Sequence, residues 1–367
     1  MNIVYVYADS EREWNCSEWR CAVPARALQH SGQHSARLLS LQDFVANKGE
    51  TREACDSADV IVVQRNLFGP VLPAMLHWQA RGKIVVVDFD DAYDLMPPTN
   101  PSYRFWHEGV VTRPDGGEER LSPQPLKQFR WGLRLAHAAT APSRRLAADW
   151  GGIAPVDYLP NYIELANYQS VPRMPHAGIH IGWGGSLSHL QSFTGSGVMA
   201  GLKRVCRARP QVKIILCGSD RRIFEQLPLP PEQKVLVPWG RYADWPQRLA
   251  MFDIGLAPLH GAYDERRSWI KVLEYLVMQI PWVASEGPAY EEFGRYGALV
   301  KNLPSAWEKA LLDRIDHLDD YRALAAGDAY QAGLACSIDA NVDQLVNTYA
   351  AIAARVQQPD VILEGVP

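Results

Sequence analysis

The first half of the chain alternates short apolar runs with longer stretches in which apolar residues recur at helical spacing. Apolar, β-branched runs predict strands at residues 2–7, 35–39, 59–64, 83–89 and 138–141. Helices are expected to end near Ser31 and to cover residues 70–81, 126–136 and 143–150. Strands that alternate with helices in this way are typical of a parallel, doubly wound α/β sheet.

The same alternation restarts in the second half. Strands are predicted at residues 178–183, 212–217, 234–237, 253–259, 282–285 and 298–301, with helices between them and further helices up to about residue 355. The segment 164–177, with prolines near its end, is predicted as a linker, and the tail 357–367 is expected to be loosely ordered. The pattern therefore indicates two consecutive units of similar design.

One helix predicted in the second half, residues 268–279, is apolar on most of its surface yet carries a polar stripe. Arg267, Lys271 and Glu274 follow each other at spacings of four and three, which places them on one side of the helix. Two interpretations stay open: Lys271 and Glu274 form a structural ion pair, or they bind a ligand. Further along, a helix opening at Ala289 would offer its N-terminus to an anion.

Polar residues gather where the predicted strands of the first half end. The carboxyl ends of parallel strands are where such sheets bind ligands. These residues are Asp9, Ser10, Gln64, Arg65, Asn66, Asp88, Asp90 and Asp91. The run 88–91 alone allows three interpretations: a substrate site, aspartates that cap the next helix, or a divalent-metal motif that holds a nucleotide diphosphate.

Three segments are irregular or glycine-rich and typical of binding loops. Residues 92–125 contain many prolines and an aromatic middle with Trp106 and His107, so this stretch is predicted as a lid. Gly184 and Gly185 lie between a strand and a helix, where glycines allow a backbone to approach a phosphate closely. The Trp239 loop presents a ring that either stacks on a base or packs against the protein.

Composition narrows the class of protein. With 367 residues, 47% of them hydrophobic and 21% charged, the chain can form two domains with cores of their own. The formal net charge of −4 argues against strong non-specific binding to nucleic acid, and six scattered cysteines are expected to be reduced thiols in a cytoplasmic protein. The N-terminus has no signal-peptide pattern, and without a run of about 18 apolar residues no membrane-spanning segment is expected.

The polar helix and its surroundings resemble retaining glycosyltransferases of the GT-B architecture, and family 4 in particular. That family has two glutamates spaced E-x7-E, followed by a G-[IT]-P-V-V-A-S run. Glu274 matches the second glutamate and residues 280–285, IPWVAS, match the run, whereas Arg266 stands at the position of the first glutamate. A bacterial and phage subset with a KS-x-x-K-x-x-E-Y helix is more similar, and its positions are filled here by Ser268, Lys271, Glu274 and Tyr275.

Three further segments resemble the same family. Residues 185–189, GSLSH, are similar to a G-S-x-[ST]-H segment of that subset, and residues 253–259, DIGLAPL, to the strand before the donor helix. The run 143–164 resembles the end of the first domain, where Asn161 matches a P-N pair. The resemblance is carried by residues 130–300 and reaches the first 130 residues only through the order of their strands.

The resemblance implies a fold and a division of roles. The fold would be α/β, a GT-B arrangement of two Rossmann-like, doubly wound parallel-sheet domains facing a cleft. Residues 1–165 would bind the acceptor, residues 176–338 the nucleotide-sugar donor, and a helix over 339–357 would cross back to the first domain. The implied reaction transfers a sugar from a nucleotide-diphosphate sugar with retention of the anomeric configuration, and it needs no metal or other cofactor.

The resemblance also implies roles for individual residues. Lys271 and His189 would neutralise the diphosphate, an aspartate would orient the acceptor hydroxyl, and the catalytic set would be Asp90, Asp91, His189 and Lys271. Donor binding would involve Gly184, Gly185, Ser186, Gly218, Trp239, Arg266, Ser268, Lys271 and Glu274. The acceptor side would include the irregular lid together with Arg65, Asp88, Trp106 and His107, and no residue would bind a metal.

Other functions stay open at this point. The same double fold supports nucleotide-sugar epimerases and hydrolases. Arg266 in place of the family's first glutamate is also compatible with a non-catalytic nucleotide-sugar-binding protein. The sequence does not identify the nucleobase or the sugar, and it leaves the acceptor open among a glycan, a protein, a small molecule and, against the acidic net charge, DNA.

Overall fold

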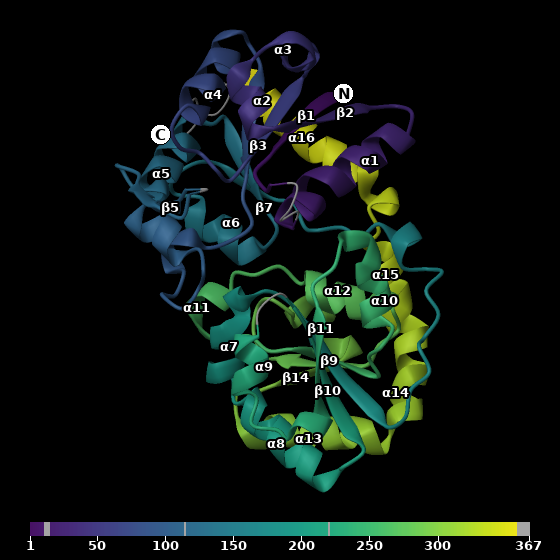
Figure 1. Ribbon diagram of the computed structural model, residues 1–367. Helices are drawn as coiled ribbons and strands as arrows, with labels where there is room; N and C mark the ends of the chain where they lie inside the picture. The colour runs from purple at the N-terminus through teal and green to yellow at the C-terminus, as the bar shows by residue number, and fades with distance from the viewer. Residues whose placement is uncertain (11–14, 114, 219–220, 358–367) are drawn as a thin grey trace, which may run out of the picture. The chain divides into compact units, whose positions relative to one another are not determined.

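The computed structural model describes residues 1–10, 15–113, 115–218 and 221–357 (Figure 1). Trp14, Pro114, Ser219 and almost all of the tail expected to be loosely ordered lie outside these ranges. The chain forms two compact units. The first contains Met1–Asp91, Phe105–Tyr162 and the segment that begins at Ile338, and the second contains Ala92–Arg104 and Ile163–Ser337.

A six-stranded parallel sheet forms the centre of the first unit. Its strands, in spatial order, are β2 (Ser35–Ser40), β1 (Asn2–Tyr7), β3 (Val60–Gln64), β4 (Ile84–Asp88), β7 (Ala138–Ala141) and β8 (Val156–Tyr158). The five residues of β3 and the five of β4 are all buried, as expected for β-branched strands covered by helices on both faces. The strand order reverses between β1 and β3, which makes the carboxyl edge there a topological switch point.

Helices of the first unit follow the strands as predicted, except for two that the sequence did not indicate. The elements are η2 (Glu18–Ala22), α1 (Val23–His30), α2 (Leu41–Ala46), α3 (Gly49–Ser57), α4 (Val71–Ala80), η4 (Arg104–Glu108), α5 (Pro125–Leu135), α6 (Arg144–Trp150), η11 (Asp339–Asn341) and α16 (Val342–Gln357). The helices α2 and α3 were not predicted from the sequence. Their only buried residues are Phe44 and Cys55, so neither helix has an apolar stripe that its sequence could reveal.

The second unit has a parallel sheet with the strand order of a Rossmann fold. Its strands, in spatial order, are β11 (Lys234–Pro238), β10 (Val212–Gly218), β9 (Ile179–Gly184), β12 (Ile254–Ala257), β13 (Trp282–Ser285) and β14 (Ala298–Val300). The order reverses between β9 and β12, so the switch point lies at the carboxyl ends of these two strands. The strands predicted for this half are confirmed to within a few residues at their ends.

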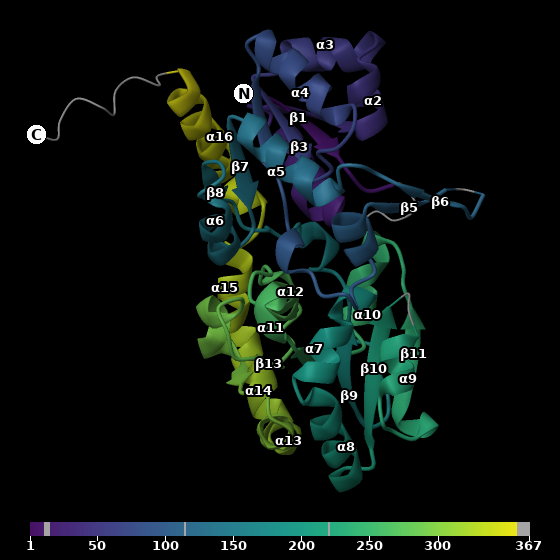
Figure 2. The same cartoon turned by 90° about the vertical axis from the view of Figure 1, so that its left-hand side faces the viewer.

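Helices surround the second sheet. They are η3 (Tyr93–Leu95), η5 (Leu165–Asn167), η6 (Leu187–His189), α7 (Leu190–Gly195), α8 (Val198–Ala208), α9 (Arg222–Gln226), η7 (Pro231–Gln233), η8 (Tyr242–Asp244), α10 (Trp245–Leu249), α11 (Gly261–Asp264), α12 (Ile270–Val277), η9 (Glu291–Tyr296), α13 (Pro304–Asp316), α14 (Leu318–Leu324), η10 (Ala325–Ala329) and α15 (Tyr330–Ala335). Both views place α8 beside α13 (Figures 1 and 2). Gly201 of α8 allows this close approach, since a Cβ there would lie 2.7 Å from the Cβ of Trp307.

The prediction of a helix that begins at Ala289 is wrong. Residues 288–290 form a turn, and the helix that follows, η9, is a six-residue 3₁₀-helix. Gly294 in its middle disfavours an α-helix. The short element lets Phe293 pack edge-on against Trp269, with ring centroids 5.2 Å apart. It therefore does not provide the α-helical N-terminus that was proposed for an anion.

The segment predicted as a single lid, residues 92–125, instead divides between the two units. Ala92–Arg104 belongs to the second unit, where Asn100 donates a hydrogen bond of 3.3 Å to the Tyr263 hydroxyl. Phe105 onward belongs to the first unit and forms the hairpin β5 (Val110–Thr112) and β6 (Glu118–Arg120).

The last helix packs on the first sheet. The Tyr349 ring of α16 meets the Tyr5 ring of β1 edge-on, with centroids 6.3 Å apart. Within the described residues, no helix is both long enough and apolar enough to cross a membrane.

Candidate functional site

The switch point of the second sheet carries a loop whose path depends on glycine. We call residues 184–187, which begin at the last residue of β9, the glycine loop. A Cβ on Gly184 would lie 1.9 Å from the Trp245 ring, so only glycine allows that ring to pack there. A Cβ on Gly218, at the end of β10, would lie 2.8 Å from the Gly185 carbonyl oxygen. Close packing therefore explains Gly184 and Gly218, two of the glycines predicted for donor binding.

Backbone N–H groups of the glycine loop are only partly available to a ligand. The Gly185 N–H donates to the Cys217 carbonyl at 3.0 Å, which extends the pairing of β9 with β10. The Gly185 N–H is therefore not open to a phosphate, and the part predicted for Gly185 in donor binding stays a prediction. Within the described part of the chain, the N–H groups of Ser186 and Leu187 have no acceptor, and they are the ones left for an anion.

Lys271 reaches the glycine loop from α12. Its ammonium donates to the Gly184 carbonyl oxygen and lies 5.2 Å from the centroid of the Trp183 ring. Burial lowers the pKa of Lys271, and the charge of Glu274 opposes that shift. Among the described residues, no ion pair joins Lys271 to Glu274, so the direct structural pair considered from the sequence does not form. The two charges instead point to different parts of the same site.

Glu274 is buried, with 5% of its surface exposed, and its carboxylate is held on one side only. Oε1 accepts from the Trp245 indole N–H at 2.7 Å and from the Tyr168 hydroxyl at 3.4 Å. Oε2 has no partner among the described residues, and it is not sealed from solvent. Burial raises the pKa of Glu274, whereas Lys271 and the two donors oppose the rise. An oriented carboxylate with one open oxygen is suited to accept hydrogen bonds from hydroxyl groups.

Trp245 and Trp239 form an aromatic pair beside Glu274. Their rings lie 6.1 Å apart at an interplanar angle of 26°. Trp239 is 42% exposed, so part of its side chain is accessible to solvent. The prediction that this ring stacks on a base therefore stays compatible with its position.

A charged network joins α11 to the turn after the glycine loop. Arg267 donates to Asp264 at 2.7 Å and to the Ser188 hydroxyl at 3.1 Å. Asp264 also accepts from the Ser192 hydroxyl at 2.6 Å, and Ser192 lies 3.3 Å from Nδ1 of His189. Burial and the nearby cations Arg267 and Lys271 lower the pKa of His189, so the ring is neutral.

Arg266, at the position of the family's first glutamate, is turned towards its own segment. Its guanidinium donates to the Ala262 carbonyl at 3.0 Å and pairs with Glu265 at 3.1 Å. Ser268 lies half-buried in the loop just before α12. Their predicted roles in donor binding stay predictions.

Asp88 of the first unit has a structural role instead of the predicted acceptor-side one. It is 1% exposed, and its carboxylate accepts from the Arg20 guanidinium and from the Thr140 hydroxyl at 2.6 Å. Arg20 also donates to the Leu159 carbonyl at 2.8 Å and to Asn161 at 2.9 Å. This buried group links η2 with β4, β7 and the end of the first domain, so neither oxygen of Asp88 is left for a substrate.

Arg65, Asp90 and Asp91 lie at the carboxyl edge of the first sheet. Arg65 pairs with Asp9 and, at 3.3 Å, with Asp90, and its backbone has a positive φ of 32°. Asp91, the residue after Asp90, is half-buried. The structure thus brings Arg65 and Asp90 together, as expected for the ends of neighbouring parallel strands.

Trp106 is part of the core and not of an open acceptor surface. It is 4% exposed and meets Phe129 edge-on, with ring centroids 5.8 Å apart. Phe129 in turn contacts Phe89 and Trp150. His107 follows Trp106 in η4 and is half-buried, so of these two residues only His107 keeps a position compatible with the predicted role.

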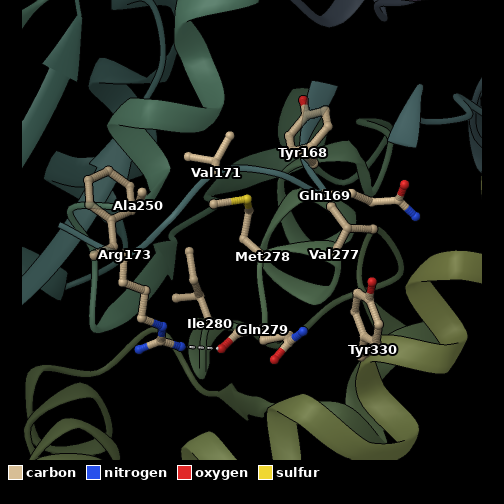
Figure 3. A pocket seen from close by; sticks show the side chains of 11 residues that line it. Tyr168, Gln169, Val171, Arg173, Ala250, Val277, Met278, Gln279, Ile280 and Tyr330 are labelled. Atoms are coloured by element: carbon tan, nitrogen blue, oxygen red, sulfur yellow. Dashed lines mark hydrogen bonds between the residues drawn. The ribbon is translucent and has the colours of Figure 1, made fainter. Parts of the chain in front are cut away.

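A separate hollow of about 150 Å³ lies at the opposite, amino edge of the second sheet (Figure 3). Phe252 and Ile280, which precede β12 and β13, line it together with Tyr168 and Arg173. Arg173 donates to a backbone carbonyl at 2.7 Å. The Tyr168 ring faces this hollow while its hydroxyl reaches Glu274, so this residue separates the hollow from the carboxyl edge.

Comparisons with known proteins identify the fold. No family model and no curated protein matches the sequence. A sucrose-phosphate synthase from Thermosynechococcus elongatus is 13% identical with a TM-score of 0.63, over 96% of this chain and 99% of that one. A glycosyltransferase from Rickettsia africae is 12% identical with a TM-score of 0.62, over 95% and 98%. A UDP-GlcNAc 2-epimerase from Neisseria meningitidis, solved with UDP-GlcNAc bound, is 11% identical with a TM-score of 0.53, over 96% and 100%.

These likenesses show the fold alone. The chain has the GT-B fold of two Rossmann-like parallel-sheet units, which confirms the predicted fold class. Among the described residues, no group of three or more His, Cys, Asp or Glu side chains is arranged to hold a metal.

Three residues that contact the site were given no role from the sequence: Tyr168, Trp245 and Arg267. Tyr168 lies in the predicted linker and Trp245 in an ordinary-looking helix, so their contacts with Glu274 carry no local signal. Arg267 was visible, because it belongs to the polar stripe with Lys271.

Proposed function

We propose that this chain is a glycosyltransferase that moves a sugar from a nucleotide-diphosphate donor, and that the donor binds at the carboxyl edge of the second sheet. The observation that carries the proposal is the convergence of three groups at one switch point: the Lys271 ammonium, the two unpaired N–H groups of the glycine loop, and the open oxygen of Glu274. A cation with backbone N–H groups suits a diphosphate, and a carboxylate acceptor suits ribose hydroxyls.

The chemistry follows from the charge that develops during transfer. The bond between the anomeric carbon and the β-phosphate oxygen breaks, and the nucleoside diphosphate leaves with the electron pair. A new bond forms from the acceptor oxygen to the anomeric carbon, and the proton of the acceptor hydroxyl passes to the departing diphosphate. Lys271, released from the Gly184 carbonyl, stabilises the negative charge that grows on the leaving group.

We extend the proposal to three finer points that rest on the sequence resemblance. The chain would belong to glycosyltransferase family 4, it would retain the anomeric configuration, and it would need no metal. Arg65 and Asp90, which meet at the carboxyl edge of the first sheet, are the groups proposed for the acceptor side. Asp91, the next residue in the chain, and His107 of η4 are proposed with them.

A second function is favoured by one comparison. The fold is also similar to that of a UDP-GlcNAc 2-epimerase, so a nucleotide-sugar epimerase or hydrolase would use the same donor site. Such an enzyme converts or cleaves the nucleotide sugar with no acceptor present. A non-catalytic binding protein would bind the nucleotide sugar without changing it.

The test is a two-stage screen of the full chain. UDP-, GDP-, ADP- and CMP-sugars are first compared by thermal shift, and the sugar nucleotide that stabilises most is then incubated with and without an acceptor mixture. Proton NMR of the products separates transfer from epimerisation and hydrolysis. A nucleotide sugar that binds and is consumed only with acceptors supports the transferase, whereas conversion that is equal without acceptors supports the second function. No stabilisation by any of the four classes would refute both.

A further inference from the structure

His189 lies at the glycine loop with one nitrogen engaged and one open. The residue is 8% exposed, and its ring stands edge-on to Trp183 with centroids 5.6 Å apart. Nδ1 lies 3.3 Å from the Ser192 oxygen. Nε2 has no partner in the described part of the chain and is not sealed from solvent. The neighbouring ring carbon, Cδ2, lies 3.2 Å from where a Cβ on Gly185 would be, so this edge of the ring faces the loop.

The proton on His189 can be located from the acceptor beyond Ser192. Asp264 Oδ2 accepts from the Ser192 hydroxyl at 2.6 Å and from the backbone N–H of His260 at 2.8 Å. Its other oxygen accepts from Arg267 at 2.7 Å. A carboxylate that receives an arginine and two further donors uses both of its oxygens as acceptors.

The Ser192 hydroxyl proton is therefore directed to Asp264. The Ser192 oxygen is left as the acceptor in its contact with His189, so Nδ1 must carry the imidazole proton. In a neutral ring this leaves Nε2 with a lone pair and no proton. Asp264 and Ser192 thus determine the tautomer of His189 through a chain of two hydrogen bonds. In histidines generally, the hydrogen bond made by one ring nitrogen sets whether the other nitrogen carries a proton.

The open nitrogen has a chemical consequence for the ligand. An unprotonated Nε2 cannot donate to a phosphate oxygen, and two lone pairs facing each other repel. The cations near the ring, Arg267 and Lys271, are better suited to phosphate charge. An acceptor at this position matches a hydroxyl group.

We infer that His189 recognises a hydroxyl of the donor sugar through Nε2, and that Ser192 and Asp264 are positioning residues that keep this nitrogen an acceptor. The inference rests on the proposed function for the identity of the ligand. It replaces the role first expected for His189, which was to neutralise the diphosphate. The sugar ring of the donor would be selected for a hydroxyl that can donate to this nitrogen.

The first arm of the test needs no ligand. Histidine in the full chain is labelled with ¹⁵N, and long-range proton–nitrogen spectra report which ring nitrogen is protonated, with His189→Gln used to identify the resonances. The expected wild-type result at neutral pH is a protonated Nδ1 and an unprotonated Nε2. Ser192→Ala should shift the population towards protonation on Nε2. A wild-type ring that is protonated on Nε2 or charged would overturn the inference.

The second arm measures binding by calorimetry with three pairs of probes: UDP and UDP-glucose, GDP and GDP-mannose, ADP and ADP-glucose. Ser192→Ala should lower the affinity for the nucleotide sugar about three- to tenfold, the effect of one neutral hydrogen bond. The affinity for the nucleoside diphosphate should not change. Thr194→Ala is the matched control, since it removes an exposed hydroxyl that donates only to the Leu190 and Gln191 carbonyls within α7.

Two results of the second arm would count against the inference in different ways. Equal weakening of the diphosphate and its sugar conjugate by Ser192→Ala would refute recognition of a sugar hydroxyl while leaving the nucleotide site in place. If none of the six probes binds, the proposed function and the sugar ligand both fail, and only the tautomer measured in the first arm stands.

Discussion

Replacing Glu274 by glutamine should separate stability from function. In the protein, Oε1 of Glu274 accepts from Trp245 and Tyr168 while Oε2 is open. A glutamine can keep both donors satisfied only if its carbonyl oxygen takes the Oε1 position. Its amide nitrogen then occupies the Oε2 position, where a donor replaces an acceptor.

The expected loss of binding follows from that exchange. A hydrogen bond to a charged group contributes about 1.5–3 kcal/mol, so nucleotide affinity should fall about 10- to 150-fold. The free energy of unfolding should not fall with it. Because burial raises the pKa of Glu274, the folded protein disfavours its charge, and a neutral side chain with the same contacts removes that cost.

The pH dependence of the stability difference gives a second reading of the same variant. The folded pKa of Glu274 lies above the unfolded value of 4.5, so the unfolded chain loses this proton first as pH rises. Wild type should therefore lose stability relative to Glu274→Gln as pH rises from about 4.5 towards neutrality, and the difference should level off below pH 4.5.

Calorimetry with the nucleotide found in the screen and thermal unfolding at several pH values provide the assay. Glu308→Gln is the matched control, because Glu308 is a surface glutamate of the same unit that pairs with Arg204 at 3.1 Å. If Glu274→Gln binds the nucleotide as wild type does and melts at a lower temperature, Glu274 is a structural residue and the donor-site reasoning fails.

Three further predictions follow from the structure. Lys271→Ala should lower kcat by on the order of 10²–10³ while changing nucleotide affinity much less, because leaving-group charge grows in the transition state; steady-state kinetics that show a loss mainly in KM would contradict this. Arg20→Met should lower the free energy of unfolding by about 3–5 kcal/mol in urea titrations, since it leaves Asp88 buried without its cation. Arg204→Met, which removes one partner of a surface ion pair, should lower it by less than about 1 kcal/mol. Equal effects of the two substitutions would contradict a structural role for Asp88. Activity on the identified donor should survive EDTA, and a complete loss that Mn²⁺ or Mg²⁺ reverses would assign the aspartates after β4 to a metal.

Much of the fold could be predicted because its signals are local. The β-branched runs of β3 and β4 are buried on both faces, and a continuous apolar run is the pattern that such strands produce. The helix α12 was visible from its apolar surface. The helix predicted at residues 143–150 is α6, which Ser143 caps by accepting from the Leu146 N–H at 3.1 Å. The helices α2 and α3 bury almost nothing, so no periodicity marked them.

The site was predicted only where its residues lie close together in the chain. Lys271 and Glu274 share one helix, and their spacing revealed a polar stripe. Asp88 and Trp106 have the residue types of a binding site. The Asp88 carboxylate is instead bonded to Arg20, which is 68 positions away in the chain, and Trp106 packs in the aromatic core. The partner of a side chain is decided by tertiary contacts, and no pattern within one segment contains that information.

A crystal structure of the protein with the nucleoside diphosphate of its preferred donor tests the central claim most directly. The account predicts the diphosphate within hydrogen-bond distance of Lys271 and the N–H groups of Ser186 and Leu187, and a ribose hydroxyl on Oε2 of Glu274. A nucleotide bound at the carboxyl edge of the first sheet, or in the hollow lined by Phe252 and Ile280, would contradict it.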